Sequence, residues 1–144
     1  MTNEKNVRVG LGVIILQNNK FLMQLRQGAH GEGSWAFPGG QIEFGETFEQ
    51  TARREVLEET NIEITNVRFG AVTNDYFKSE DKHYITVWML SDWKSGDAKI
   101  MEPHKCLQQK WVTFNSLPSP LFLTMENLLT SDFIEDIKLQ VATL

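Results

Sequence analysis

The sequence predicts an α+β or layered α/β fold around a mixed β-sheet. β-rich and helical runs follow one another in the order strands, helix, strands, helix, which is typical of those architectures. The 144 residues suffice for one hydrophobic core, and 41% hydrophobic with 23% charged residues is the composition of a globular protein. No repeat or linker interrupts the chain, so we expect one domain over residues 1–144.

A β-hairpin is the first expected element. Residues 7–16 alternate between apolar and small side chains, two asparagines interrupt the pattern, and residues 20–26 resume it. A turn-rich loop follows at residues 30–34. The chain then passes through residues 35–38 into a pair of glycines.

A helix is expected to begin near Thr47. Thr47 and Gln50 have the spacing of a capping box, and the run that follows holds no Gly or Pro. Asn61 is the expected stop, because asparagine tolerates the left-handed conformation that ends helices. The expected apolar stripe of this helix consists of Phe48, Ala52 and Val56.

Two long strands and a shorter one are expected after the helix. Residues 63–77 and 83–93 are rich in Val, Ile, Thr and aromatic residues, and a charged turn at 78–82 joins them. Residues 107–114 form a further strand pattern. Residues 118–137 contain a second helical stretch.

Three acidic residues gather on one side of the first helix. At about 100° per residue, Glu55, Glu58 and Glu59 fall within an arc of roughly 100°. Like charges at this spacing repel, so a cation should compensate them. Hard carboxylate oxygens suit Mg²⁺ or Mn²⁺. The alternative is an ordinary solvated acidic face, which is what most charge runs are.

Charge and cysteine content exclude several classes of protein. A net charge of −5 and a pI near 5.2 argue against a basic surface for a nucleic acid polymer. The single cysteine, Cys106, permits no intramolecular disulfide and fits a reducing compartment. The N-terminus lacks a signal-peptide pattern and no run is long enough to span a bilayer, so we expect a cytoplasmic protein with no membrane partner. Monomer and homodimer both remain open.

The segment from Gly40 to Ile62 resembles the Nudix box, whose pattern is G-x5-E-x7-R-E-U-x-E-E-x-G-U with U an aliphatic residue. The departure is Asn61, where the family has glycine, and asparagine is the usual second choice at a left-handed cap. The matching positions are Gly40, Glu46, Arg54, Glu55, Val56, Glu58, Glu59 and Ile62.

The resemblance implies a fold and a family branch. Nudix domains are α/β/α sandwiches with a mixed sheet, and the box forms their loop-helix-loop. Similarity to the MutT-like branch, which hydrolyses nucleoside triphosphates, extends from about Val9 to Phe114, more weakly outside the box than inside it.

The resemblance also implies roles for individual residues. The metal ligands would be Glu55, Glu58, Glu59 and the backbone of Gly39. Arg54 and Glu46 would orient the catalytic glutamates or support the loop.

The base that takes a proton from water remains open, because family members differ. Glu55 is one candidate, and Glu102 is the other, with a solvated loop acid as its ordinary alternative. His30 and His104 lie in polar loops, where we expect surface residues.

Substrate recognition is expected on the sheet and loops beyond the box, where a base can stack on aromatic rings. Phe37 and Phe122 have the hydrophobic core as their alternative location. The candidates are Arg26, Phe37, Gly39, Gly40, Asn74, Thr86, Phe122 and Leu123.

The function implied is Mg²⁺-dependent hydrolysis of (deoxy)nucleoside triphosphates, oxidised ones such as 8-oxo-dGTP included, to a nucleoside monophosphate and pyrophosphate. Tyr76 stands close to where dinucleoside polyphosphate hydrolases often carry a tyrosine, so these and other nucleoside diphosphate-linked compounds are alternative substrates. A non-catalytic nucleotide-binding module is the alternative of a different class. Such modules usually lose box glutamates, and this chain retains them.

Overall fold

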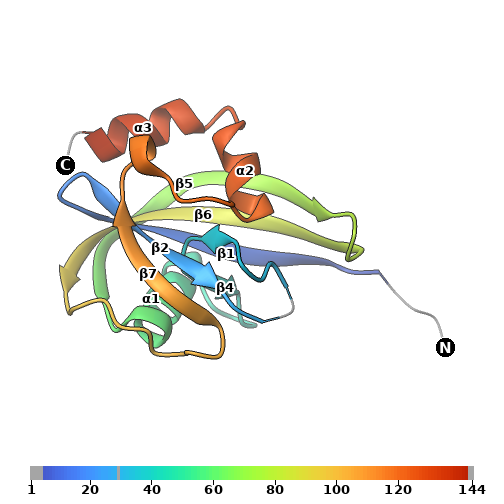
Figure 1. The fold of residues 1–144 in the computed structure, drawn as a ribbon, viewed down its shortest axis with the longest axis horizontal. Helices are drawn as coiled ribbons and strands as arrows, with labels where there is room; N and C mark the ends of the chain where they lie inside the picture. The colour runs from blue at the N-terminus through green and yellow to red at the C-terminus, as the bar shows by residue number, and fades with distance from the viewer. Residues whose placement is uncertain (1–4, 29, 143–144) are drawn as a thin grey trace.

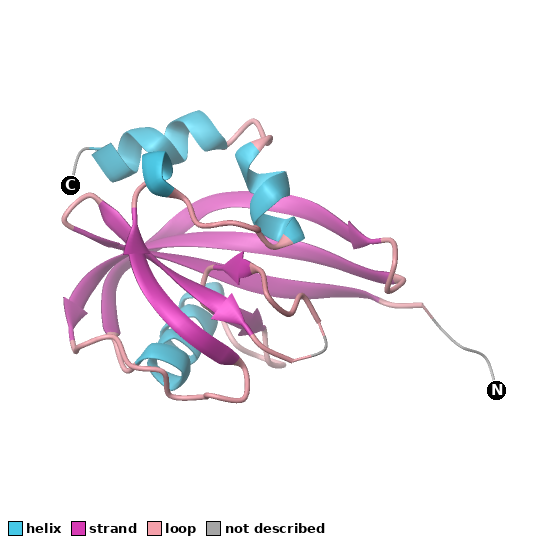
Figure 2. Ribbon diagram, viewed as in Figure 1, coloured by secondary structure: helices cyan, strands magenta, loops and turns pink. Residues whose placement is uncertain are grey.

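The computed structural model describes residues 5–28 and 30–142. A mixed β-sheet lies between two layers of helices (Figures 1 and 2). Helix α1 (Phe48–Thr60) covers one face, and α2 (Leu123–Leu129) and α3 (Ile134–Ala142) cover the other. The predicted layered α/β/α arrangement is therefore confirmed.

The sheet has the order β3-β2-β1-β6-β5, with β4 paired to β1 and β7 paired to β2. Strands β1 and β6 run parallel and the other paired strands run antiparallel, which makes the sheet mixed. A short 3-10 helix, Phe114–Ser116, follows the last strand. The strands are β1 (Val7–Gln17), β2 (Lys20–Arg26), β3 (Trp35–Ala36), β4 (Gly39–Gln41), β5 (Glu63–Phe77), β6 (Lys82–Ser95) and β7 (Cys106–Val112).

The predicted hairpin exists only at its closed end. Asn18 and Asn19 have φ of 53° and 64°, the left-handed conformation that a tight hairpin turn requires. Strands β1 and β2 pair directly beside this turn, at Leu16–Phe21 and Gln17–Lys20. Beyond it they separate, because β3 pairs with β2 and β4 pairs with β1 in the space between them.

The approach of β4 to β1 requires glycine at position 39. A Cβ atom built on Gly39 would lie 1.9 Å from the carbonyl oxygen of Leu11, which no side chain can accommodate. The amide of Val13 donates to the carbonyl of Pro38 at 2.8 Å and continues the contact along β1. The inserted segment is thus bonded to β1 through backbone alone.

Each face of the sheet has its own hydrophobic core. On the α1 side, Val13 and Ile15 of β1 pack with Ala52 and Val56. On the α2 and α3 side, the alternate residues of β1 pack against the C-terminal helices. Strand β1 is buried on both faces over residues 11–16, as expected for a central strand beside a parallel neighbour.

Helix α1 begins and ends as predicted. Thr47 and Gln50 form the reciprocal capping box, and Asn61 adopts the left-handed conformation with φ 65°. The predicted apolar stripe is wrong at its start, because Phe48 is 43% exposed and Thr51 is buried instead. Burial of Thr51 is tolerated because its hydroxyl donates to the Glu46 carboxylate at 2.9 Å.

The predicted C-terminal helical stretch is two helices. Helix α2 ends at Leu129, and α3 continues past residue 137 to Ala142. Between them, the hydroxyl of Ser131 donates to the Leu128 carbonyl and accepts from the Phe133 amide. These local bonds compete with helical ones and explain the break. In the part of the chain that the structure describes, no helix is both long and apolar enough to cross a membrane.

We predict that Asn61→Gly leaves the free energy of unfolding within about 0.5 kcal/mol of wild type, because both residues accept the left-handed cap. Asn61→Val should cost about 1–2 kcal/mol, because a β-branched side chain is strained there. Urea unfolding of the three proteins measures both differences. A loss above about 1 kcal/mol in the glycine variant would show instead that the Asn61 side chain stabilises the fold. Its bond is the long one that Nδ2 donates to the Asp97 carbonyl, at 3.5 Å.

Candidate active site

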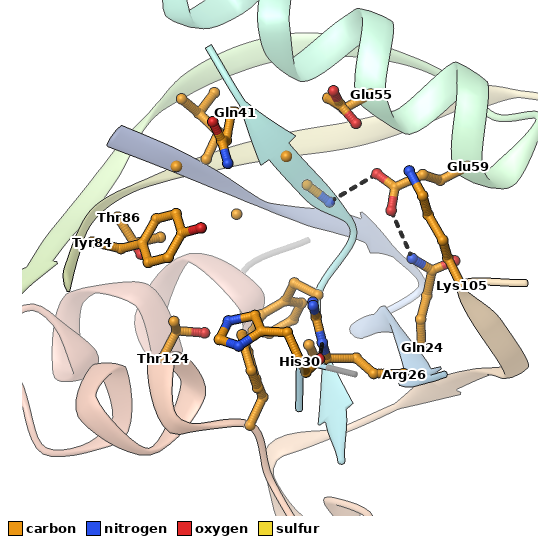
Figure 3. Close-up of a pocket in the computed structure, with 18 of the residues that line it drawn as sticks. Gln24, Arg26, His30, Gln41, Glu55, Glu59, Tyr84, Thr86, Lys105 and Thr124 are labelled. Carbon is orange, nitrogen blue, oxygen red and sulfur yellow. Dashed lines mark hydrogen bonds between the residues drawn. The ribbon is translucent and has the colours of Figure 1, made fainter. Parts of the chain in front are cut away.

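A cavity of about 500 Å³ opens where β1 and β2 separate. Its walls come from β1, β2, β4 and β6, from α1 at one end and from the start of α2 at the other (Figure 3). This volume is within the usual range for small-molecule sites. Among the lining residues are Gln24, Arg26, Gln27, His30, Phe37, Gly39, Gly40, Glu55, Glu59, Phe77, Tyr84, Thr86, Glu102, Lys105, Phe122 and Thr124.

Two glutamates of α1 form the acidic end of the cavity. The amide of Gly39 donates to Glu59 Oε2 at 3.0 Å, and Gln24 Nε2 donates to Glu59 Oε1 at 3.3 Å. The Glu55 carboxyl lies so close to Gly40 that a Cβ there would be 2.4 Å from its Cδ. Gly40 therefore lets the chain pass directly beside Glu55, and the neighbouring amide of Gly39 bonds Glu59.

The surroundings of these carboxylates disfavour negative charge. Burial, and then the neighbouring charge of Glu55, raises the pKa of Glu59 to about 8. Burial also raises the pKa of Glu55, although Arg54 opposes that shift. Two oxygen donor groups that repel each other in one cavity would be stabilised by a cation.

Glu58 does not join them. Its side chain is 54% exposed and lies 3.5 Å from Arg54 Nη1, as an i,i+4 pair on the outer side of α1. Across residues 5–28 and 30–142, no three His, Cys, Asp or Glu side chains are grouped closely enough to hold a metal ion. Glu55 and Glu59 therefore line the cavity while Glu58 lies outside it, and metal binding by all three stays a prediction.

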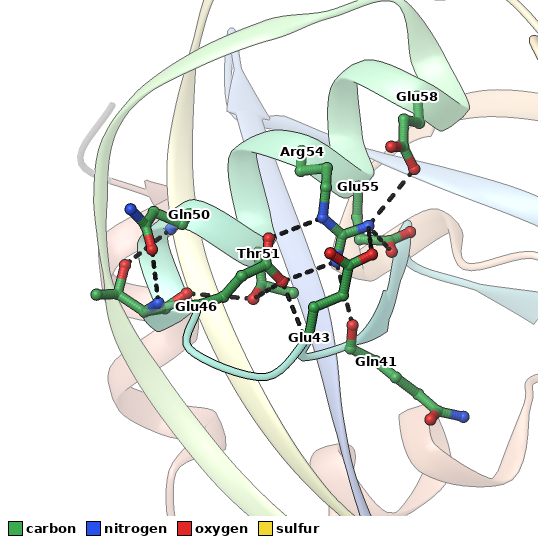
Figure 4. A network of polar contacts seen from close by, with 9 residues as sticks. Gln41, Glu43, Glu46, Gln50, Thr51, Arg54, Glu55 and Glu58 are labelled. Carbon is green, nitrogen blue, oxygen red and sulfur yellow. Dashed lines mark hydrogen bonds and ion pairs between the residues drawn. The ribbon is translucent and has the colours of Figure 1, made fainter.

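Arg54 holds the box together (Figure 4). Its Nε and Nη2 donate to the two oxygens of Glu46 at 2.8 and 2.9 Å, and its Nη1 donates to Glu55 at 2.6 Å. Nη2 also donates to the Gln41 carbonyl at 3.2 Å. Hydrogen bonds from Arg54 lower the pKa of Glu46 to about 2. The contacts are those expected for residues that orient a glutamate.

Aromatic rings surround the opposite end of the cavity. The Arg26 guanidinium lies 4.2 Å from the centre of the Phe122 ring. The His30 ring lies 4.5 Å from Phe77 and 5.3 Å from Phe122, centre to centre. The expectation that His30 is a surface residue is wrong: a contact from its Nδ1 to Glu80 and these rings hold it against the cavity. His104 is exposed, as expected.

Six of the predicted substrate residues line the cavity, and two do not. Asn74 is exposed on the opposite face of β5, because successive side chains of a strand alternate and Asp75 points inward instead. Leu123 packs on the small core around Phe77 and Phe122, whereas the next residue, Thr124, lines the cavity. The six are Arg26, Phe37, Gly39, Gly40, Thr86 and Phe122.

Glu102 also reaches the cavity, where Lys105 lies 3.8 Å from its carboxylate. Lys105, Gln24, Tyr84 and Thr124 line the site without having been predicted. Gln24 carried a signal, since it is the polar residue inside the otherwise apolar run from Phe21 to Leu25. The remaining three carried none, because the direction of a side chain on a loop, a helix start or a strand end is known only once the fold is known.

Comparison with known proteins gives consistent matches. The family described as NUDIX domain matches residues 6–131. The 8-oxo-dGTP diphosphatase of Proteus vulgaris is 34% identical over 98 residues, 66% of this chain and 85% of that protein. The NAD-capped RNA hydrolase NudC of Vibrio vulnificus is 30% identical over 109 residues, 74% of this chain but 39% of that protein. The crystal structure of a MutT NUDIX hydrolase from Burkholderia pseudomallei superposes with a TM-score of 0.80 at 25% identity, covering 88% of this chain and 100% of that one.

We predict that the stability of the metal-free protein depends on pH through Glu59. Between about pH 4.5 and 8 the folded state retains a proton that the unfolded state has lost, so the free energy of unfolding falls as pH rises. Glu59→Gln removes this dependence, and its stability relative to wild type should increase by about 1–4 kcal/mol from pH 5 to pH 8. Urea unfolding in a chelator at each pH measures the difference.

Glu46→Gln is the matched control, because Arg54 shifts the pKa of Glu46 in the opposite direction. The stability that Glu46 contributes is present above about pH 4.5 and is lost as pH falls toward 2. This variant should therefore be less stable than wild type at neutral pH. If Glu59→Gln behaved in the same way, burial of the Glu59 charge would not be a cost to the fold.

We predict that Arg54→Lys lowers the free energy of unfolding by about 1–3 kcal/mol, because an ammonium group cannot bond both oxygens of Glu46 and also reach Glu55. Arg53→Lys is the control at the preceding position, where the side chain is 42% exposed, pairs with Glu49 at 3.3 Å and donates to one backbone carbonyl, that of Ile64. Its effect on urea unfolding should be smaller than that of Arg54→Lys. Equal losses would contradict a special role for the Arg54 network.

Proposed function

The chain belongs to the NUDIX family, and from this premise we propose that it hydrolyses (deoxy)nucleoside triphosphates to a nucleoside monophosphate and pyrophosphate with a divalent cation, Mg²⁺ or Mn²⁺. The observation that carries the proposal is the division of one cavity into an acidic end and an aromatic end. Carboxylates suit a cation with bound phosphates, and stacked rings suit a base. A nucleotide likewise carries its phosphates at one end and its base at the other.

The residues at the acidic end fit a divalent cation. Glu55 and Glu59 offer hard oxygens in a region that disfavours their uncompensated charge, and the Gly39 carbonyl belongs to the adjoining strand β4. Glu58 is the remaining proposed ligand; its pairing with Arg54 is partly exposed and therefore weakly held. A cation bound there would neutralise phosphate charge and make its bound water more acidic.

The chain's own groups would position the reactants. Arg54 fixes the Glu55 carboxylate, and Glu46 fixes Arg54. Either Glu55 or Glu102 would accept the proton of the attacking water, since both line the cavity. Phosphoanhydride hydrolysis requires mainly positioning and charge neutralisation, and these groups together with a bound cation would supply both.

The aromatic end would hold the base. Phe77, Phe122 and His30 form a ring-lined wall, and Arg26 places a positive charge between this wall and the acidic end. The name of the Proteus vulgaris relative makes 8-oxo-dGTP the first substrate to test. Tyr76, which suggested dinucleoside polyphosphates, is 49% exposed, bonds Asp81 and does not line the cavity. Those compounds are therefore the weaker candidates.

We predict that hydrolysis of the preferred triphosphate in ¹⁸O-water places label in the nucleoside monophosphate or in pyrophosphate, because water attacks an internal phosphorus. Mass spectrometry of the products from a panel of triphosphates, 8-oxo-dGTP, dinucleoside polyphosphates and nucleoside diphosphate sugars measures this. Label in orthophosphate, with nucleoside diphosphate accumulating, would contradict the mechanism. A complete lack of turnover would favour a nucleotide-binding module.

Variants of the box glutamates identify the site in the same assay. Glu55→Gln and Glu58→Gln should each lower kcat at least about 100-fold, because each removes a carboxylate while retaining its shape. Glu49→Gln is the control on the exposed first turn of α1 and should keep wild-type turnover. Near wild-type turnover of Glu58→Gln at limiting Mg²⁺ would show that Glu58 stays outside the cavity during the reaction and is not a metal ligand.

A further inference from the structure

Another buried carboxylate, that of Asp75, lies beneath the aromatic end of the cavity. Asp75 is on β5 and its exposed fraction is 0%. It takes no part in the acidic cluster of α1. A fully buried aspartate is uncommon unless its oxygens are satisfied by donors.

Three donors satisfy Asp75. Asn127 of α2 donates through Nδ2 to Oδ1 at 2.9 Å. The hydroxyls of Thr73 and Thr86 donate to Oδ2 at 3.0 and 2.5 Å. Trp88 Nε1 in turn donates to the Thr73 hydroxyl at 2.9 Å, so Thr73 both gives and accepts. The network therefore runs from the indole of Trp88 to the carboxylate.

Thr86 is the member of this network that lines the cavity as well. It lies on β6, directly across from Thr73 of β5, and is 6% exposed. A threonine hydroxyl has one hydrogen and two acceptor sites. Because a carboxylate can only accept, Asp75 takes the hydrogen of Thr86. Toward a ligand in the cavity, the Thr86 oxygen can then act only as an acceptor.

We propose that Asp75 sets the hydrogen-bond polarity of Thr86, and that Thr86 thereby selects nucleotides whose base carries an exocyclic amino group. An exocyclic amino group is the donor that projects furthest from a base ring, and adenine, guanine and cytosine carry one. Hypoxanthine, uracil and thymine do not. At the position of that amino group, hypoxanthine carries a hydrogen or a carbonyl, and uracil and thymine carry a carbonyl. The Thr86 acceptor would then be unpaired or would face another acceptor, and both are costly in a buried site. Asp75 is a positioning residue here, since it acts through Thr86.

This inference rests on the proposed nucleotide site but not on catalysis, so equilibrium binding tests it. Calorimetry in a chelator would compare the monophosphates of guanine with hypoxanthine, adenine with hypoxanthine, and cytosine with uracil. In at least one pair the wild type should bind the amino-bearing member about ten-fold more tightly. Thr86→Val, which keeps the shape but has no hydroxyl, should reduce that ratio to about one.

Asp75→Asn gives the opposite test of polarity. If its oxygen continues to accept from Asn127, the new amide nitrogen faces both threonine hydroxyls and donates to them. The hydrogen of Thr86 is then released toward the cavity. The variant should therefore lose the preference for the amino-bearing base or reverse it toward the carbonyl-bearing one.

Thr73→Val is the matched control. It removes a bond to the same carboxylate and leaves the Trp88 indole without its acceptor, so the variant should be less stable to urea. Thr73 does not line the cavity, and the base preference of wild type should persist. A preference lost equally in Thr73→Val and Thr86→Val would overturn the inference in favour of a purely structural network.

The remaining outcomes separate this inference from the proposed function. Equal affinity within every pair for wild type would overturn the role of Thr86 while leaving a nucleotide site intact. Failure to bind any monophosphate would overturn the nucleotide site and this inference together. Retention of the preference in a folded Thr86→Val protein would also overturn the inference.

Discussion

The close approach of Gly39 to Leu11 is the constraint on which the rest of this structure depends. Because no side chain separates the two backbones, the segment from Trp35 to Gln41 fits between β1 and β2 and prevents them from closing as a hairpin. The same approach brings the Gly39 amide to Glu59. The opening of the sheet, the cavity and the placement of one carboxylate thus have a common origin in backbone packing.

Arg54, the arginine at the acidic end, is not shared equally among the carboxylates. Arg54 is committed to Glu46 by two bonds and to Glu55 by one, which leaves Glu59 with neutral donors alone. Burying an ionised carboxylate without a cationic partner lowers the stability of a fold. Retention of Glu59 is understandable if affinity for a cation, rather than stability, determined the arrangement. The loss of stability from buried charge and the proposed binding of a cation would then both arise from Glu55 and Glu59.

The sequence predicted the parts of this site that local chemistry determines. The capping box at Thr47, the left-handed end at Asn61 and the bond from Arg54 to Glu46 depend on near neighbours, and these three features have the expected conformation or contacts. The separation of β1 from β2 was not predictable, because it depends on a strand inserted from elsewhere in the chain. The direction of β5 side chains was missed for a similar reason: bulges shift the register upstream, so Asp75 rather than Asn74 faces inward. His30 reaches the cavity only through partners distant in sequence, such as Glu80.

The two ends of the cavity use buried carboxylates in opposite ways. Glu59 accepts two neutral hydrogen bonds and faces a second carboxylate, so without a cation it holds a proton up to about pH 8, and a cation would displace that proton. Asp75 accepts three hydrogen bonds, and no further partner is needed to keep it buried. A buried carboxylate with few hydrogen-bond donors attracts a cation. A buried carboxylate whose oxygens all accept hydrogen bonds fixes the direction of those bonds instead. Recognition of phosphate and recognition of a base would therefore rest on the same functional group, distinguished by the number of donors that the fold supplies.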